Sequence, residues 1–334
     1  MKLRSLLGAV GALLISLVLF LLMVEVGVRL YTRYAIVYDV EMVRYANEVK
    51  IQSGNPRIGH VHRPGASAVL MGVPVEINAD GLRDRDYAVA RGGGERIVLL
   101  GDSLTFGWGV AEEQTFGTLL EEELSRHRPT EVLNFGTGNY NTEQQVNLFL
   151  DEGLKYRPDR VVVFYFINDA EPTPRKSRWE VLGHSRAFTF FWSRFKAARS
   201  RLTQSRSFRD YYADLYADEQ PGWKGAREAF LTLRDVCAER GIDLKVVLLP
   251  ELHQLRDYPF AAEYRTVADF LERNGIATLD ITPSFADVDN PMSLWVAPDD
   301  AHPNAIAHAR IAEAALAFVA GGGANGAPRR PTAH

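Results

Sequence analysis

The sequence has a single cysteine, Cys237, and no excess of positive charge over its 334 residues. One cysteine excludes an internal disulfide and a cysteine metal cluster. The formal net charge of −4 gives no electrostatic reason to expect a nucleic-acid partner. The chain also has no internal repeat. Its length and ordinary hydrophobic content instead predict one large globular domain with appendages.

The amino-terminal segment is a long hydrophobic run. Residues 5–24 contain only apolar, glycine and serine side chains. About 20 residues of helix rise roughly 30 Å, the thickness of the hydrocarbon core of a bilayer. The run is long for a secretory signal and no A-x-A cleavage site follows it. We therefore expect residues 1–30 to form an uncleaved single-pass anchor rather than a cleaved signal. Basic residues flank both ends of the run, so the positive-inside rule does not by itself decide the orientation. We favour an orientation that places the rest of the chain outside the cytoplasm.

Changes in composition divide the rest of the chain. Residues 31–94 predict a juxtamembrane helix followed by a small β-hairpin, because glycines and prolines punctuate two short apolar stretches. Residues 95–320 form the predicted main domain. Within it, residues 170–222 are rich in arginine and aromatic side chains without a clear period, which indicates an insertion over the carboxyl edge of the sheet. The glycine-rich tail at 321–334 has no means of packing, so we expect it to be disordered.

The main domain has a repeated strand–helix rhythm. Five short aliphatic stretches alternate with helical patterns, at residues 96–100, 131–135, 160–167, 242–249 and 276–281. Such alternation predicts an α/β fold with a parallel sheet, right-handed crossovers and helices on both faces. Strand order 2-1-3-4-5 would place the topological switch point beside the first strand.

A serine follows the first predicted strand. The strand runs from Arg96 to Leu100 and stops at Gly101, and Ser103 lies two residues further on. Open α/β sheets place their ligands at the carboxyl ends of their strands. Ser103 is therefore a candidate nucleophile, which requires a base, an acid to orient that base, and donors for an oxyanion.

The last predicted strand leads to a histidine beside two aspartates. Asp299 stands three residues before His302, on what we expect to be a turn ahead of a final helix that begins at Pro303. From such a turn Asp299 can reach the Nδ1 atom of His302, which leaves Nε2 free to take the serine proton. A helix-capping role is the alternative for His302.

Two loops at the same edge could supply oxyanion donors. One covers residues 136–141 after the second strand, and the other contains Asn168, whose side-chain amide can donate. Asn168 as a simple turn residue is the alternative. We expect the neighbouring Asp102 and Asp169 to fix loop geometry through backbone hydrogen bonds rather than to act as an acid or base. Both are also candidates for substrate contact.

Further polar residues are candidate ligands. Glu251 and His253 follow the fourth strand and are candidates for substrate contact, with solvated loop residues as the alternative. His60 and His62 have the spacing of metal ligands, but they lack a third ligand nearby, so a pair of loop residues is favoured and no metal site is predicted.

Four blocks of the sequence together resemble the GDSL family, or SGNH-hydrolase superfamily, over residues 95 to 320. The blocks are Gly101-Asp102-Ser103-Leu104, the glycine-containing loop at 136–141, Asn168-Asp169 and Asp299-x-x-His302. The resemblance implies a flavodoxin-like three-layer αβα sandwich and serine acyl hydrolysis without a metal or cofactor. It also implies Ser103 as nucleophile, His302 as base and Asp299 as the orienting acid. The Ser103 backbone and the Asn168 amide would then lie in the oxyanion hole.

The second block departs from the family pattern. Strict register puts Asn139 where the donor glycine belongs, so the backbone donor is either Gly138 or Asn139, and Asn139 would need a positive φ. The segment 78–84 also resembles a leader of membrane-anchored bacterial members. By contrast, Thr105 stands where the second glycine of an α/β-hydrolase nucleophile elbow would be, which argues against that fold.

These features predict an enzyme of the bacterial cell envelope. It would be a single-pass protein of the inner membrane with a periplasmic or extracellular catalytic domain, hydrolysing an acyl ester, with acetyl as one candidate, on a carbohydrate or lipid. Two alternatives are an acyltransferase that passes the acyl group to a glycan and a non-catalytic polysaccharide-binding or assembly protein.

Overall fold

The computed structural model describes residues 2–173, 184–202 and 207–321. The predicted tail from residue 322 onward lies outside these residues, as does residue stretch 174–183 of the predicted insertion. The chain forms two compact units, one combining residues 1–48 with 175–205 and the other combining residues 49–174 with 206–334. We call them the amino-terminal unit and the sheet unit.

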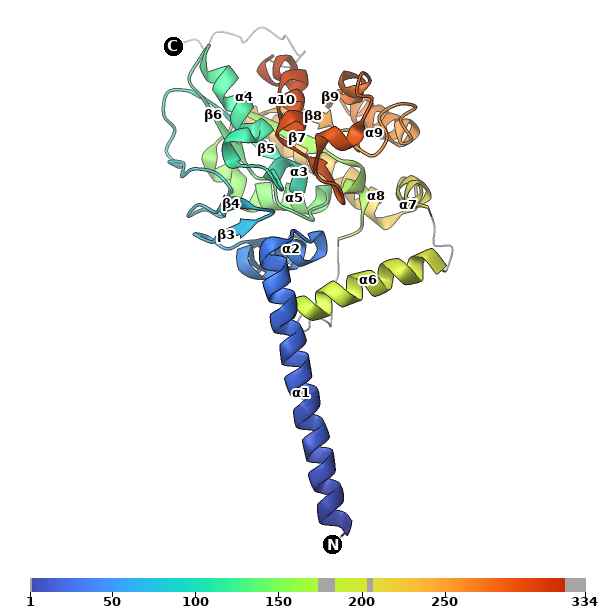
Figure 1. Ribbon diagram of the computed structural model, residues 1–334. Coiled ribbons are helices and arrows are strands. Elements are labelled where there is room, and N and C mark those ends of the chain that lie inside the picture. Colours follow the sequence, from blue (N-terminus) through green and yellow to red (C-terminus); the bar gives the residue numbers. More distant parts are fainter. Residues whose placement is uncertain (1, 174–183, 203–206, 322–334) are drawn as a thin grey trace, which may run out of the picture. The chain divides into compact units, whose positions relative to one another are not determined.

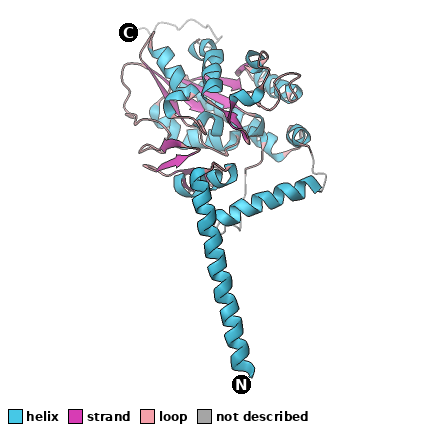
Figure 2. Cartoon of the chain, viewed as in Figure 1, coloured by secondary structure: helices cyan, strands magenta, loops and turns pink. Residues whose placement is uncertain are grey.

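The sheet unit is organised around five parallel strands, and Figure 2 shows them flanked by helices. Their order is β6-β5-β7-β8-β9, which is the predicted order 2-1-3-4-5. The strands are β5 (Glu95–Leu100), β6 (Thr130–Asn134), β7 (Arg160–Tyr165), β8 (Asp243–Leu248) and β9 (Ala277–Asp280). The predicted α/β fold is therefore confirmed.

Helices cover both faces of the sheet, because both faces of its central strands are apolar. In β5, Ile97 and Leu99 face one core while Val98 and Leu100 face the other. The first core contains α4 (Phe116–Ser125) and α10 (Ala305–Ala320), and the second contains α5 (Thr142–Leu148), α8 (Pro221–Arg240) and α9 (Ala261–Arg273). Two short helices, α3 (Ser103–Phe106) and α7 (Phe208–Leu215), complete the described helices of this unit. The result is a three-layer αβα sandwich.

Three pairs of short antiparallel strands add to the sheet unit. They are β1 (Lys50–Gln52) with β2 (His60–His62), β3 (Ser67–Leu70) with β4 (Val73–Glu76), and β10 (Trp295–Ala297) with β11 (Asp300–Pro303). The pairing of β3 with β4 confirms the hairpin predicted from sequence.

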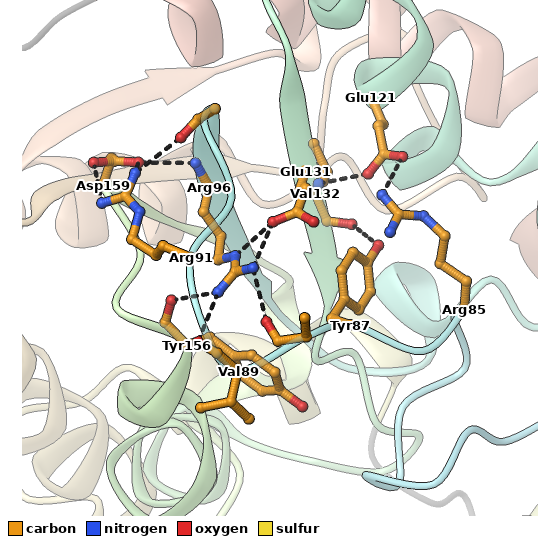
Figure 3. Close-up of polar contacts among 12 residues, drawn as sticks. Arg85, Tyr87, Val89, Arg91, Arg96, Glu121, Glu131, Val132, Tyr156 and Asp159 are labelled. Atoms are coloured by element: carbon orange, nitrogen blue, oxygen red, sulfur yellow. Dashed lines mark hydrogen bonds and ion pairs between the residues drawn. The ribbon is translucent and has the colours of Figure 1, made fainter.

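The segment that leads into β5 is bound to the amino end of the sheet (Figure 3). The buried Arg96 side chain donates to Glu131 and to the carbonyl oxygen of Tyr156. Asp159 accepts from Arg91 and from the backbone N–H of Arg96. These contacts fix the first strand where the chain enters the sheet, at the end opposite to Ser103.

The amino-terminal unit contains three α-helices among its described residues. They are α1 (Lys2–Tyr34), α2 (Tyr38–Arg44) and α6 (Arg186–Leu202), and both α1 and α2 pack against α6. α1 is the described helix that is long and apolar enough to cross a membrane, over Leu6–Tyr34, and its apolar window is not buried within the protein. α6 comes from the predicted insertion at 170–222, which is thus divided between the two units.

Candidate active site

The turn after β5 places Ser103 at the amino end of α3. Asp102 caps this helix, and its Oδ1 accepts a hydrogen bond from Leu104 N–H at 2.9 Å. A Cβ atom on Gly101 would lie 1.9 Å from Oγ1 of Thr105, so only glycine fits this bend. Ser103 therefore lies at the carboxyl edge of the sheet on a sharply constrained turn.

His302 reaches Ser103 from the other end of the fold. The Oγ of Ser103 lies 2.8 Å from Nε2 of His302, although 199 positions separate the two residues. The other ring nitrogen, Nδ1, is 2.5 Å from Oδ1 of Asp300. A hydroxyl, an imidazole and a carboxylate are thus connected in the order that general-base activation of a serine requires.

The carboxylate partner of His302 is Asp300, and the prediction of Asp299 was wrong in this contact. The segment 300–303 is the strand β11 rather than a turn before a helix, and α10 begins at Ala305 rather than Pro303. Side chains two residues apart share one face of a strand. Asp300 and His302 therefore lie on the same face, while Asp299 is exposed in the bend between β10 and β11.

Asp300 is held by a residue that sequence reasoning missed. Nε1 of the buried Trp108 donates to Oδ2 of Asp300 at 2.9 Å, and the backbone N–H of His302 donates to Oδ1. Burial alone would raise the pKa of Asp300, but the hydrogen bonds and charge of His302, with the Trp108 bond, bring it below its ordinary value. Trp108 follows Ser103 by only five positions, but no pattern in the sequence links it to Asp300.

The loop after β6 lies directly against the nucleophile turn. A Cβ atom on Gly136 would lie 2.2 Å from the backbone nitrogen of Phe106, and Thr137 N–H donates to the carbonyl oxygen of Gly101. Asn139 has φ of 66°, the positive value expected for it. The predicted oxyanion loop and the serine turn are therefore packed together.

Lys50 and His60 fix the peptide that joins Gly138 to Asn139. Nζ of the buried Lys50 lies 2.6 Å from the carbonyl oxygen of Gly138, and it also donates to Oδ1 of Asn139. Nε2 of His60 lies 3.2 Å from the same carbonyl oxygen. Because a peptide unit is planar and trans, fixing this C=O also fixes the direction of the Asn139 N–H, which points the opposite way. Neither Lys50 nor His60 was predicted to contact this loop.

The two histidines lie on the strand β2 rather than in a loop. His60 contacts the Gly138 carbonyl, and Nδ1 of His62 contacts the carbonyl oxygen of Gly81. Burial, and then the charge of Lys50, lowers the pKa of both histidines to about 3. Among the described residues, no group of three or more His, Cys, Asp or Glu side chains could hold a metal ion.

Asn168 and the two neighbouring aspartates lie where the chain leaves β5 and β7. Burial raises the pKa of Asp102, and the Leu104 N–H and the Asn168 side chain lower it by less. Burial and the charge of Asp102 raise the pKa of Asp169 well above its ordinary value. Asp169 accepts from the Gln145 amide and from Phe166 N–H. Both carboxyl groups are buried, which favours the predicted loop-supporting role over contact with substrate.

Glu251 and His253 form a second histidine–carboxylate pair after β8. The buried Glu251 accepts hydrogen bonds from the backbone N–H and from Nδ1 of His253. The side-chain hydrogen bond to Glu251 is the main cause of the raised pKa of His253. The imidazole lies between Phe208 and Trp295, with ring centroids 5.3 and 4.7 Å away. Trp295 pairs across the β10–β11 hairpin with the residue after His302, so this aromatic cluster adjoins the strand that carries the histidine.

A doubly wound parallel sheet with serine, histidine and aspartate meeting at its carboxyl edge defines the class of SGNH-type hydrolases. Residues 99–310 match the model of the GDSL-like lipase/acylhydrolase family. This match covers more than half of the chain. The protein belongs to this family and is a GDSL-type ester hydrolase.

Comparison with solved structures gives distant similarities. An acetyl xylan esterase is 16% identical, with 67% of this chain and 99% of that chain covered and a TM-score of 0.43. A catalytic mutant of an acetylxylan esterase from Geobacillus stearothermophilus is 16% identical, with 69% and 95% covered and a TM-score of 0.46. A two-domain esterase active on acetylated mannans is 15% identical, with 67% and 48% covered and a TM-score of 0.44. No curated protein matches the sequence.

Proposed function

We propose that the protein is a serine esterase that forms an acyl-enzyme on Ser103. The observation that carries the proposal is the 2.8 Å contact between the Ser103 hydroxyl and Nε2 of His302, with Asp300 bound to Nδ1. His302 takes the serine proton as Oγ attacks the acyl carbon, and it then delivers that proton to the departing alcohol. Water attacks the acyl-enzyme by the reverse proton transfers, which releases the carboxylic acid and restores Ser103.

Three donors are proposed for the oxyanion that develops during attack. They are the backbone N–H of Ser103, the backbone N–H of Asn139 and the side-chain amide of Asn168. Between Gly138 and Asn139, we favour Asn139, since Lys50 and His60 hold its peptide by the carbonyl and so fix the direction of its N–H.

The proposed substrate is an acyl ester, with acetyl as the first candidate, on a carbohydrate or lipid of the cell envelope. α1 supports this location because it has the length and apolarity of a membrane span, with a mean hydropathy of 2.8 over 18 residues. We propose that α1 anchors the enzyme in the bacterial inner membrane with its catalytic residues outside the cytoplasm. The cluster of Phe208, His253 and Trp295 offers exposed ring surface for sugar or acyl contact beside β11.

The test is turnover of short-chain aryl esters by the purified full-length chain in detergent. Replacing the nucleophile, Ser103→Ala, should lower kcat by roughly 10⁶-fold, as loss of a catalytic serine does in other hydrolases. Fluorophosphonate labelling followed by peptide mapping should identify Ser103 as the modified residue. Equal turnover by the variant and the parent, or labelling at another serine, would remove Ser103 from the mechanism.

A further inference from the structure

α6 carries a row of four aromatic side chains, of which three are exposed and Phe188 is half-buried. Phe188, Phe191, Trp192 and Phe195 follow the i, i+3, i+4, i+7 spacing, so they share one face of the helix. Phe191 is 54% exposed, Trp192 45% and Phe195 55%. The rings of Phe188 and Trp192 are stacked, as are those of Trp192 and Phe195. A contiguous exposed apolar patch of this kind marks a site of interaction with a membrane or with another protein.

The first turn of α6 is bound to α1 at the end of its apolar run. Glu25 is the first ionisable residue after the apolar residues 5–24. Its carboxylate accepts hydrogen bonds from Ser185 Oγ and from the backbone N–H groups of Arg186 and Ala187. If α1 spans a bilayer, Glu25 lies where the hydrocarbon ends and the headgroups begin. The start of α6 therefore lies at this level too, and Figure 1 shows α6 running away from α1 across its axis.

The charge of α6 has one sign. Its sequence contains arginines and a lysine but no aspartate or glutamate. The guanidinium group of Arg194 lies 3.4 Å from the centre of the Phe190 ring, and Nζ of Lys196 lies 5.9 Å from that of Trp192. A helix with an aromatic stripe beside cationic side chains has the composition that binds in the plane of an anionic membrane surface.

We propose that α6 is a second membrane attachment, an interfacial helix that lays Phe188, Phe191, Trp192 and Phe195 into the anionic bilayer beside α1. Its 17 residues extend about 25 Å along the surface at 1.5 Å per residue. This inference rests on the proposed anchoring by α1. It differs from that proposal in the segment involved, in its orientation in the plane of the membrane, and in its need for anionic lipid.

Spin labels on single cysteines in the full-length protein test the proposal. Cys237→Ala removes the one native thiol. Phe195→Cys then reports on the aromatic face, and the adjacent Arg194→Cys is its matched control on another face of the same turn. Leu14→Cys reports on the anchor. Each labelled protein is reconstituted in phosphatidylcholine vesicles with and without phosphatidylglycerol, and collision rates with oxygen and with a water-soluble nickel chelate are measured. Aryl-ester turnover checks that each variant is folded.

With phosphatidylglycerol present, the label at position 195 should show a ratio of oxygen to nickel collisions several-fold above that of the label at 194. The difference should shrink in pure phosphatidylcholine. A water-exposed label at 195, with the label at position 14 in the hydrocarbon, would overturn the interfacial helix and leave the anchor intact. A label at 195 shielded from both reagents would also overturn it, because protein would then cover this face. A water-exposed label at position 14 would overturn both proposals.

Discussion

Adjacent aspartates provide the sharpest test of the catalytic geometry, because only one of them contacts His302. Oδ1 of Asp300 accepts from the His302 ring and Oδ2 accepts from the Trp108 indole. In Asp300→Asn, the new NH₂ group must face one of these two N–H donors. The amide therefore cannot satisfy both contacts, and in either orientation a neutral side chain replaces the carboxylate that stabilises the imidazolium formed during attack. Asp299 is exposed, so Asp299→Asn changes only a surface charge.

The expected loss in Asp300→Asn is roughly 10⁴-fold in kcat, the scale found when the orienting aspartate of a serine triad becomes asparagine. This factor corresponds to about 5 kcal/mol of transition-state stabilisation at 1.36 kcal/mol per tenfold change. Asp299→Asn should stay within about twofold of the parent, since surface substitutions away from a site have small effects.

Steady-state kinetics with a short-chain aryl ester measure both variants, and far-ultraviolet circular dichroism confirms that each is folded. Equal losses in the two variants, or a larger loss in Asp299→Asn, would refute the assignment of Asp300. A loss confined to Asp300→Asn would establish that the triad acid stands two residues before the histidine.

Three further predictions concern the supports of the site. Lys50→Met should lower kcat by up to about 10²-fold with KM little changed, because the Asn139 N–H is no longer fixed for the oxyanion. The control variant Lys224→Met, at an exposed lysine, should keep the parent kcat. A loss only in KM in Lys50→Met would contradict the reasoning. Trp108→Phe leaves Oδ2 of Asp300 without the indole donor. Steady-state kinetics should show kcat lower by roughly tenfold or more, since a hydrogen bond to a charged group contributes about 1.5–3 kcal/mol. An unchanged kcat would show that the indole does not support the triad. Burial raises the pKa of Asp84 to about 7, so the folded state binds a proton that the unfolded state has lost. The free energy of unfolding of the parent, measured relative to that of Asp84→Asn in urea titrations of both proteins, should therefore fall by up to about 1.4 kcal/mol per unit as pH rises from 5 to 7.

The main architecture could be predicted from the sequence because its signals are local. The aliphatic runs at 160–167 and 242–249 correspond to β7 and β8, and the strand order followed from the βα rhythm. Ser103 could be found for the same reason, since it follows the end of β5, and His302 could be found because it lies in the Asp-x-x-His block that resembles the family. The structure confirms that these two side chains meet.

The contacts that support the site could not be predicted from local patterns. Choosing Asp300 over Asp299 requires knowing that residues 300–303 are extended, and the proline at 303 suggested a helix start instead. Lys50 contacts a carbonyl 88 positions away, and an isolated lysine carries no sequence pattern. Such contacts depend on how distant segments pack, which is decided by the tertiary fold.

The segment before the family match is part of the catalytic structure and not only a link to the membrane. The match begins at residue 99, yet residues 49–94 belong to the sheet unit. The guanidinium group of the buried Arg83 donates to the carbonyl oxygens of Phe106, the last residue of α3, and of Val110, four residues further on. Lys50 holds the oxyanion loop from the other side. Because Arg83 and Lys50 donate to carbonyl groups of the serine turn and of the oxyanion loop, this segment stabilises the conformation of both.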